Sequence, residues 1–267
     1  MDLGLLVICG LTFVIHLVGT LAYSVRIAGS RTGRIALSLS LFNILILVSR
    51  TSNSFQAPLL AKRVEQQLAS GNATPSTADF RWLLVSATLA TIVGAFLIPT
   101  FQRLSAASVE AVGRRRSMWA LASRALSPST LAHLRESVAM PSWRNLSAAH
   151  RGPHMPWGVA ILNAVAVAIW AVGVFSALYA GYLRPELRVT SSQLSSVVNG
   201  VATIAMFGFV DPYLSFLTDD VAGGRLDEPY FRRSIVWLTG GRLVGTVLAQ
   251  ALLVPAAGWI AFVAARI

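Results

Sequence analysis

Residues 157–183 read WGVAILNAVAVAIWAVGVFSALYAGYL, a run of 27 residues that contains no charged side chain. A helix rises 1.5 Å per residue, so about 20 residues cross the roughly 30 Å hydrocarbon core of a membrane. In lipid, every backbone N–H and C=O must find its partner within the protein, and a single span achieves this as a helix. The run therefore predicts a transmembrane helix.

Five further apolar blocks of similar length flank this run. Together they predict an all-α, polytopic membrane protein that forms a single integral membrane domain over residues 1–267. We expect its six spans near residues 3–24, 35–57, 82–102, 157–183, 193–218 and 236–263. The first block is expected to be retained as a span, because no positively charged segment of the kind found in a signal peptide precedes it.

Composition supports a membrane protein and excludes several other classes. Apolar residues make up 55% of the chain and charged residues 12%, about half the charge of a soluble domain. The net charge is +11, and most of the basic residues lie between the apolar blocks. This position favours a role in membrane topology over nucleic-acid binding. Cys9 is the only thiol and Lys62, which follows alanine, is the only lysine. We therefore expect no internal disulfide, no Walker A loop, no metal site and no cofactor.

The arginines predict the orientation. Fourteen of the 22 basic residues follow the first, third or fifth span, so these loops are expected in the cytoplasm and both termini outside. Residues 103–156 then form a basic cytoplasmic loop. Within it, residues 106–126 are typical of a basic amphipathic helix on an anionic leaflet, although the plain topological charge of a cytoplasmic loop is the favoured explanation. The histidines at 133, 150 and 154 predict no metal site, because Gly152 and Pro153 interrupt any helix there.

Span two carries a polar face. Asn43, Arg50 and Ser54 recur at helical spacing, with Asn53 beside them. Arg50 is expected about 22 Å from the inner surface, counting from Ile35 at 1.5 Å per residue. It either lines a polar path or extends outward from the helix end.

Span five carries a polar stripe, formed by Ser192, Ser196, Asn199 and Thr203, that leads to Asp211 and Pro212. Proline cannot donate to the carbonyl four residues earlier, so an interruption of the helix is expected here. Arg242 of span six is expected at the same depth as Asp211, which predicts an ion pair between them. The pair either holds the two spans together or opens when an anionic head group competes for the arginine.

Span one places His16 near the middle of the membrane, on one face with Thr12, Thr20 and Tyr23. His16 either relays protons or hydrogen-bonds to an adjacent helix. Small residues at intervals of four predict close helix packing, without chemistry of their own. They are Gly241, Gly245 and Ala249 in span six, and Gly173, Ala177 and Gly181 in span four.

The ionisable groups inside the spans are a poor set for a hydrolytic site, because Asp211 is the only carboxylate and His16 the only histidine well inside a span. Arginines suit phosphate, which their planar fork binds bidentately. The candidate substrate-binding residues are Arg26, Arg31, Arg34, Asn43, Arg50, Asn53, Asn199 and Arg242, and those for proton coupling or an ion pair are His16 and Asp211. A path for a head group requires the polar faces of spans one, two, five and six to converge.

Residues 20–59 read TLAYSVRIAGSRTGRIALSLSLFNILILVSRTSNSFQAPL. This run is similar to the signature stretch of the Amj family, bacterial lipid II flippases that act as alternates to MurJ, and FVDPY at 209–213 is also similar. The resemblance implies a transporter of the bacterial plasma membrane, not an enzyme. It implies movement of lipid II, or another polyprenyl-linked precursor, from the inner to the outer leaflet without ATP hydrolysis.

Three alternatives remain open at this point. The first is a lipid-binding scaffold for envelope enzymes that transports nothing. The others are an enzyme acting on undecaprenyl phosphate, which the poor set of acids and bases disfavours, and a coupled transporter of small solutes. Partners beyond the substrate are membrane lipids and, because six helices offer little room for a large head group, a second copy of the chain in a homodimer.

Overall fold

The computed structural model describes residues 2–70, 77–115, 136–141 and 155–267. In these ranges the chain forms six long apolar helices and no strand, which confirms the predicted all-α membrane fold. Five spans are the helices α1 (Leu3–Thr32), α2 (Ile35–Ala69), α3 (Ala78–Arg115), α7 (Trp157–Leu183) and α11 (Glu228–Ala264). The remaining span combines η1 (Pro185–Leu187), α8 (Arg188–Gln193), α9 (Ser195–Ala205), η2 (Met206–Val210) and α10 (Asp211–Ala222).

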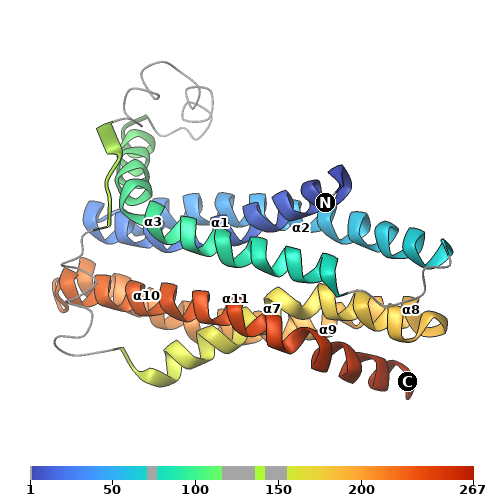
Figure 1. Ribbon diagram of the computed structural model, residues 1–267. Coiled ribbons are helices and arrows are strands. Elements are labelled where there is room, and N and C mark those ends of the chain that lie inside the picture. The colour runs from blue at the N-terminus through green and yellow to red at the C-terminus, as the bar shows by residue number, and fades with distance from the viewer. Residues whose placement is uncertain (1, 71–76, 116–135, 142–154) are drawn as a thin grey trace.

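The helices form two halves that lie side by side, as Figure 1 shows. In the N-terminal half, α1 packs against both α2 and α3, and in the C-terminal half α7 packs against α11 and α9. Contacts between the halves are sparser, and the most extensive joins α3 to α11. The weak seam between two well-packed halves is where a polar path has room to form.

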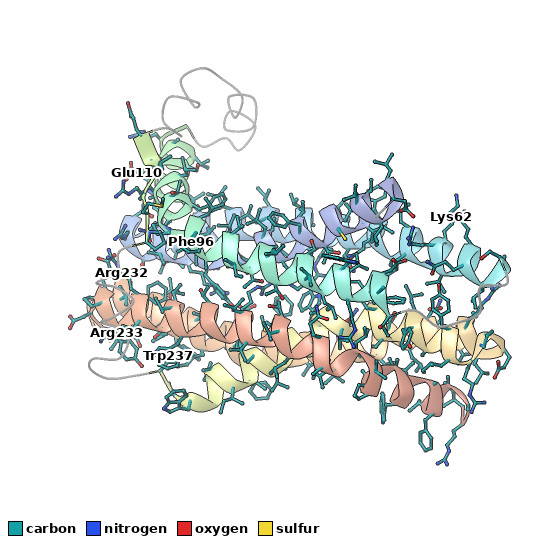
Figure 2. The ribbon with its side chains drawn as sticks, viewed as in Figure 1. Lys62, Phe96, Glu110, Arg232, Arg233 and Trp237 are labelled. Atoms are coloured by element: carbon teal, nitrogen blue, oxygen red, sulfur yellow. The ribbon has the colours of Figure 1, made fainter. Side chains whose placement is uncertain are left out.

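The sequence predicts more arginines at one end of the bundle than at the other. Both termini lie at one end, here called the termini end (Figure 1). The opposite end, here called the basic end, is where α1 and α10 finish and α11 begins. Figure 2 shows Arg232 and Arg233 there, with Lys62 toward the termini end.

Most helices extend beyond the predicted spans. The helix α2 was expected to end near residue 57 but continues to Ala69, because Leu60 and Val64 stay buried on the face that packs against the bundle. Likewise α3 continues to Arg115, and α11 begins at Glu228 instead of near residue 236. Hydropathy marks the apolar part of a helix, whereas Arg, Glu and Gln, which favour helix, carry it further.

The start of α1 is fixed by a capping residue. The Asp2 carboxylate accepts a hydrogen bond from the Leu5 N–H at 2.8 Å and another from Arg63 at 2.6 Å. Both bonds favour the ionised form, so they lower the pKa of Asp2. At the other end of α1, Gly33 adopts φ of 64°, the left-handed conformation that commonly ends a helix.

The basic amphipathic helix predicted at residues 106–126 is not separate in its described part, which continues α3 through Arg115. Toward its C-terminal end α3 turns away from the bundle (Figure 1), and Pro99 lies inside this helix. Residues 116–126, and the histidines at 133, 150 and 154, lie outside the described residues.

The fifth span is interrupted where the sequence predicted. A π-helix occupies Met206–Val210, and α10 follows with Pro212 in its first turn. Proline removes a backbone donor and the wider π-turn accommodates the change in register. The interruption places Asp211 at the start of a new helix that faces α1.

The glycines of α11 allow close packing on α7, as predicted. A Cβ added to Gly241 would lie 3.1 Å from the carbonyl oxygen of Ala160, and one at Gly245 would lie 2.5 Å from that of Ala164. Only glycine permits this approach of the two backbones.

We expect Gly245→Val to destabilise the protein, because the new side chain would meet Ala164 and Val167 and force α7 and α11 apart. Overpacking of this kind costs about 1–3 kcal/mol. The measurement is the Tm of the purified protein in detergent. Gly258→Val is the matched control on the same helix, since a Cβ at Gly258 meets nothing within 4 Å. Equal Tm values for the two variants would contradict the packing argument.

Candidate functional site

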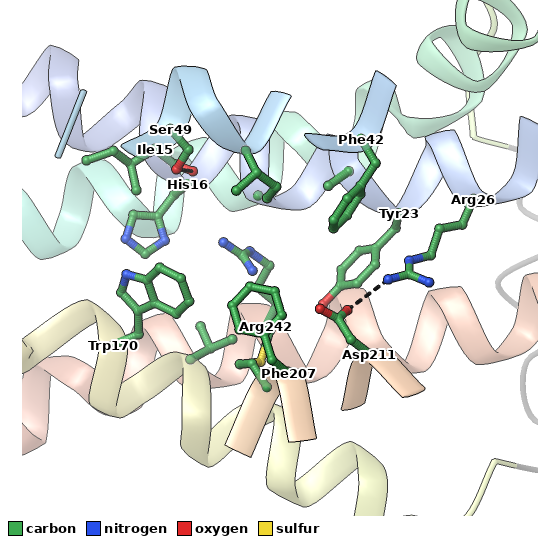
Figure 3. Close-up of a pocket in the computed structure, with 15 residues that line it drawn as sticks. Ile15, His16, Tyr23, Arg26, Phe42, Ser49, Trp170, Phe207, Asp211 and Arg242 are labelled. Carbon is green, nitrogen blue, oxygen red and sulfur yellow. Dashed lines mark hydrogen bonds and ion pairs between the residues drawn. The ribbon is translucent and has the colours of Figure 1, made fainter. Parts of the chain in front are cut away.

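A cavity with several polar residues in its lining, here called the central chamber, lies between the two halves and is lined from α1, α2, α7, η2, α10 and α11. Its volume is about 70 Å³. Its polar lining residues are His16, Tyr23, Arg26, Ser49, Trp170, Asp211 and Arg242 (Figure 3). Spans one, two, five and six therefore converge, and span four joins them.

A buried ion pair joins the halves at the chamber. Nη2 of Arg26 on α1 lies 3.1 Å from Oδ1 of Asp211, and Nη1 donates to Ser215 Oγ at 3.0 Å. The guanidinium also lies 5.0 Å from the centre of the Phe42 ring. The side chain of Arg26 is only 5% exposed, so its charge depends on this carboxylate.

The predicted ion pair between Asp211 and Arg242 is therefore wrong. The two residues do lie in the same chamber, so the depth estimate was sound. Sequence gives depth along a helix but not which way neighbouring helices turn. Because α10 faces α1, the carboxylate meets Arg26 instead.

Arg242 forms no ion pair with the residues that the structure describes, and its Nε is buried without an acceptor. Its guanidinium rests on Gly19 of α1, where a Cβ would overlap it. Figure 3 shows Arg242 between His16 and the Arg26–Asp211 pair. An arginine held in a protein cavity without a carboxylate is suited to bind an anion.

His16 is 5% exposed, and its Nδ1 is buried with no hydrogen-bond partner among the described residues. The predicted bond to an adjacent helix is therefore not made through Nδ1.

A smaller cavity of about 20 Å³ continues from the chamber toward the termini end. His16 and Trp170 line both cavities. The other polar residues of the smaller cavity are Thr12, Asn53, Gln56 and Asn199. Gln56 donates to the Thr12 hydroxyl, whereas Oδ1 of Asn199 is buried without a partner. Polar groups thus extend from Arg26 to Asn199 along the seam.

The structure brings together six of the candidate residues from the sequence: His16, Arg26, Asn53, Asn199, Asp211 and Arg242. It does not bring in Asn43 or Arg50, which are exposed on the opposite face of α2. Arg31 and Arg34 lie near the α1–α2 turn, where Arg31 Nε lies 2.5 Å from Glu228 Oε1.

Sequence reasoning missed two buried amides. Asn163 of α7 is fully buried, accepts from the Tyr23 hydroxyl at 3.3 Å and donates to the Leu238 carbonyl at 2.8 Å. Gln56 is buried on the face of α2 that meets Thr12 of α1, away from the polar face of Asn43 and Arg50 that the sequence predicted. In both cases the available signal was an amide inside an apolar block, which is costly unless it is bonded.

The chamber carries two guanidinium groups and one carboxylate, so it is suited to bind a single anionic group. No three His, Cys, Asp or Glu side chains gather into a cluster in the part of the chain that the structure describes. The chemistry available is therefore anion binding and exchange of ion-pair partners.

Comparison with known proteins identifies the family. The family model described as Amj, alternate to MurJ, matches residues 11–264. This chain belongs to the Amj family. The lipid II flippase Amj of Bacillus subtilis (strain 168) is 36% identical over 254 residues, 93% of this chain and 92% of that protein. No solved structure matches this chain. The Amj match covers both halves and the chamber between them.

We expect Asp211→Asn to lower the abundance of this Amj-family protein in membranes, because Arg26 keeps its charge but loses its counter-charge. Removing one partner of a buried pair costs about 3–5 kcal/mol. The double variant Arg26→Gln with Asp211→Asn removes both charges and should recover most of the abundance, measured by immunoblot of the membrane fraction.

The control is Asp220→Asn, which breaks an ion pair with Arg225 whose arginine is 66% exposed. It should have little effect, as exposed pairs contribute little. Normal abundance of Asp211→Asn would show that Arg26 does not depend on this carboxylate.

Proposed function

We propose that this protein is a lipid II flippase, which moves the lipid-linked peptidoglycan precursor from the inner to the outer leaflet of the bacterial plasma membrane. The observation that carries the proposal is the 36% identity with the lipid II flippase Amj over nearly the whole of both chains. The six apolar helices agree with a multi-pass membrane protein. The protein acts as a transporter, not as a catalyst of bond cleavage, and without ATP hydrolysis.

The central chamber supports transport of an anionic amphiphile. Arg26 and Arg242 bind the diphosphate, while Asn53 and Asn199 offer amide donors and acceptors further along the seam. Apolar tails stay in the surrounding lipid, since the outer surface of the bundle is apolar. This division suits a lipid better than a small solute.

The described conformation is closed to a head group. A volume of about 70 Å³ admits a few water molecules, not a disaccharide with a peptide. Passage therefore requires the halves to move apart along their seam. An anionic head group promotes this movement when it replaces Asp211 on Arg26, because the ion pair that joins α1 to α10 is then lost.

Protons provide a coupling route. Protonation of Asp211 removes its charge and frees Arg26 for a phosphate, and His16 is a second titratable group in the same chamber. These residues are our candidates for coupling transport to the proton gradient.

The basic end of the bundle faces the cytoplasm in our proposal, and both termini face outward, in accordance with the bias of short cytoplasmic loops toward arginine. Lipid II then enters from the end that carries most of the arginines.

A homodimer accounts for the exposed polar face of α2. Arg50 and Asn43 point away from the single chain, and Arg50 lies well inside a helix long enough to span the membrane. A charge facing lipid is costly, so contact with a second copy would shield it and add its donors to the path. Alternatively, the Arg50 side chain extends toward the outer membrane surface of the single chain. The crosslinking experiment below distinguishes this alternative from the dimer.

The decisive experiment is outer-leaflet exposure of lipid II in cells depleted of their resident flippase. We expect the protein to restore exposure and growth. Arg242→Gln should reduce exposure at least tenfold, because the chamber loses an anion-binding group. Its abundance should stay normal, because Arg242 forms no ion pair with the residues that the structure describes. Arg266→Gln, just beyond the C-terminal end of α11, is the matched control and should behave as wild type.

The orientation of the protein is checked by labelling a terminal tag from outside the cell. A correctly oriented protein that restores no lipid II exposure would favour the scaffold instead.

The assay is repeated with an uncoupler of the proton gradient. Unchanged exposure would remove His16 and Asp211 from a coupling role.

The dimer is tested by crosslinking in native membranes. Leu47 is 61% exposed on α2, so Leu47→Cys in a Cys9→Ser background should give a crosslinked dimer. Val254→Cys, exposed on α11, is the control and should give much less. Monomer alone from Leu47→Cys would contradict a dimer through α2.

A further inference from the structure

A second and larger pocket opens at the basic end, between α1, α3 and α11, with a volume of about 490 Å³. We call it the basic-end pocket. Residues 139–141 form part of its wall, and Thr100 holds this segment against α3. The Ala139 N–H donates to Thr100 Oγ1 at 3.0 Å, and that hydroxyl donates to the Ala139 carbonyl at 3.1 Å. The segment 139–141 is therefore attached to α3 and forms a wall on one side of the pocket.

Three arginines line the basic-end pocket: Arg31 from α1, Arg103 from α3 and Arg232 from α11. Glu228 neutralises part of this charge, since its Oε1 lies 2.5 Å from Arg31 and 2.9 Å from Arg232. Arg103 forms no ion pair with the residues described. Three guanidinium groups and one carboxylate leave a net charge of about +2, which complements a diphosphate better than a phosphodiester of charge −1.

The interior of the pocket is apolar. Ile27, Ile98, Ile235 and Leu243 line it behind the arginines. A free inorganic anion would leave this surface unused, whereas a lipid can place its first methylene groups there. Gly240 also lines the pocket, and a Cβ at this position meets nothing within 4 Å, so open space begins at the backbone of α11.

The two cavities are lined by different faces of α1 and α11. Ile27 and Leu243 line the basic-end pocket, while their neighbours in sequence, Arg26 and Arg242, line the central chamber. Movement of the two halves apart where α1 meets α11 would join the cavities. The ion pair between Arg31 and Glu228 crosses the same seam as that between Arg26 and Asp211.

We propose that the basic-end pocket is a separate binding site for the diphosphate head and first isoprene units of a polyprenyl diphosphate lipid, taken from the leaflet at the basic end. Arg31, Arg103 and Arg232 bind the diphosphate, and the apolar wall receives the start of the chain. This deepens the proposed function, on which its substrate class rests, by assigning a loading site outside the central chamber.

The test uses the purified full-length protein titrated with undecaprenyl diphosphate, with bound lipid counted by native mass spectrometry. Gly240→Phe adds a ring to the wall of the pocket from a Cβ position with no heavy atom within 4 Å, so we expect at least tenfold weaker binding. Gly258→Phe, at an open position of the same helix, should bind as wild type. The comparison is repeated in an Arg242→Gln background, so that binding in the central chamber does not mask the loss.

A charge variant keeps the test independent of the fold of Gly240→Phe. Arg103→Gln should weaken binding severalfold, whereas Arg266→Gln should not. Unchanged affinity in both Gly240→Phe and Arg103→Gln would overturn the site. Equal affinity for phosphatidylglycerol would overturn the preference for a diphosphate, and equal affinity for inorganic pyrophosphate would overturn the role of the apolar wall.

This experiment measures lipid binding and not transport, so it tests the basic-end pocket separately from the proposed flippase function. A protein that shows these losses of affinity but never restores lipid II exposure keeps the site and loses the flippase assignment. A protein that restores exposure while Gly240→Phe and Arg103→Gln bind normally keeps the flippase assignment and loses the site.

Discussion

The ion pair between Arg26 and Asp211 is the interaction on which the site depends. It joins α1 of the N-terminal half to α10 of the C-terminal half, and only 5% of the arginine side chain is exposed. A buried charge of this kind is stable only while its partner stays in place. Any ligand that opens the seam must therefore supply a substitute anion to Arg26, which links the movement of the halves to the chemistry of the ligand.

The π-helix at Met206–Val210 makes this pair possible. An unbroken α-helix from Ser195 onward would carry a different register past Pro212 and turn Asp211 elsewhere. The interruption instead starts a new helix whose first turn faces α1. Because π-turns and prolines weaken the regular ladder of backbone hydrogen bonds, the same place is suited to bend when the halves move.

Sequence predicted the six helices, the interruption at Pro212 and four residues of the chamber, His16, Arg26, Asp211 and Arg242, because apolar length and the cost of a buried charge are properties of the chain itself. It failed where the outcome depends on how helices turn about their axes. The Asp211 partner and the exposed position of Arg50 are both of this kind. The continuation of α2 to Ala69 was missed for another reason. Residues that favour helix continue beyond the end of the apolar block, and hydropathy does not detect them.

The contacts between the halves suggest an order of opening. Between the chamber and the basic end, arginines of α1 meet carboxylates of the C-terminal half, at Asp211 and Glu228. Toward the termini end, the described contacts across the seam are neutral, as between Gln250 and the Arg81 carbonyl or Tyr182 and Gln67. A diphosphate competes directly for arginines held by carboxylates but has no comparable hold on neutral pairs. If the protein moves a diphosphate lipid as proposed, we expect arrival of the head group to open the basic end first and the termini end to stay closed until the head group has entered the chamber.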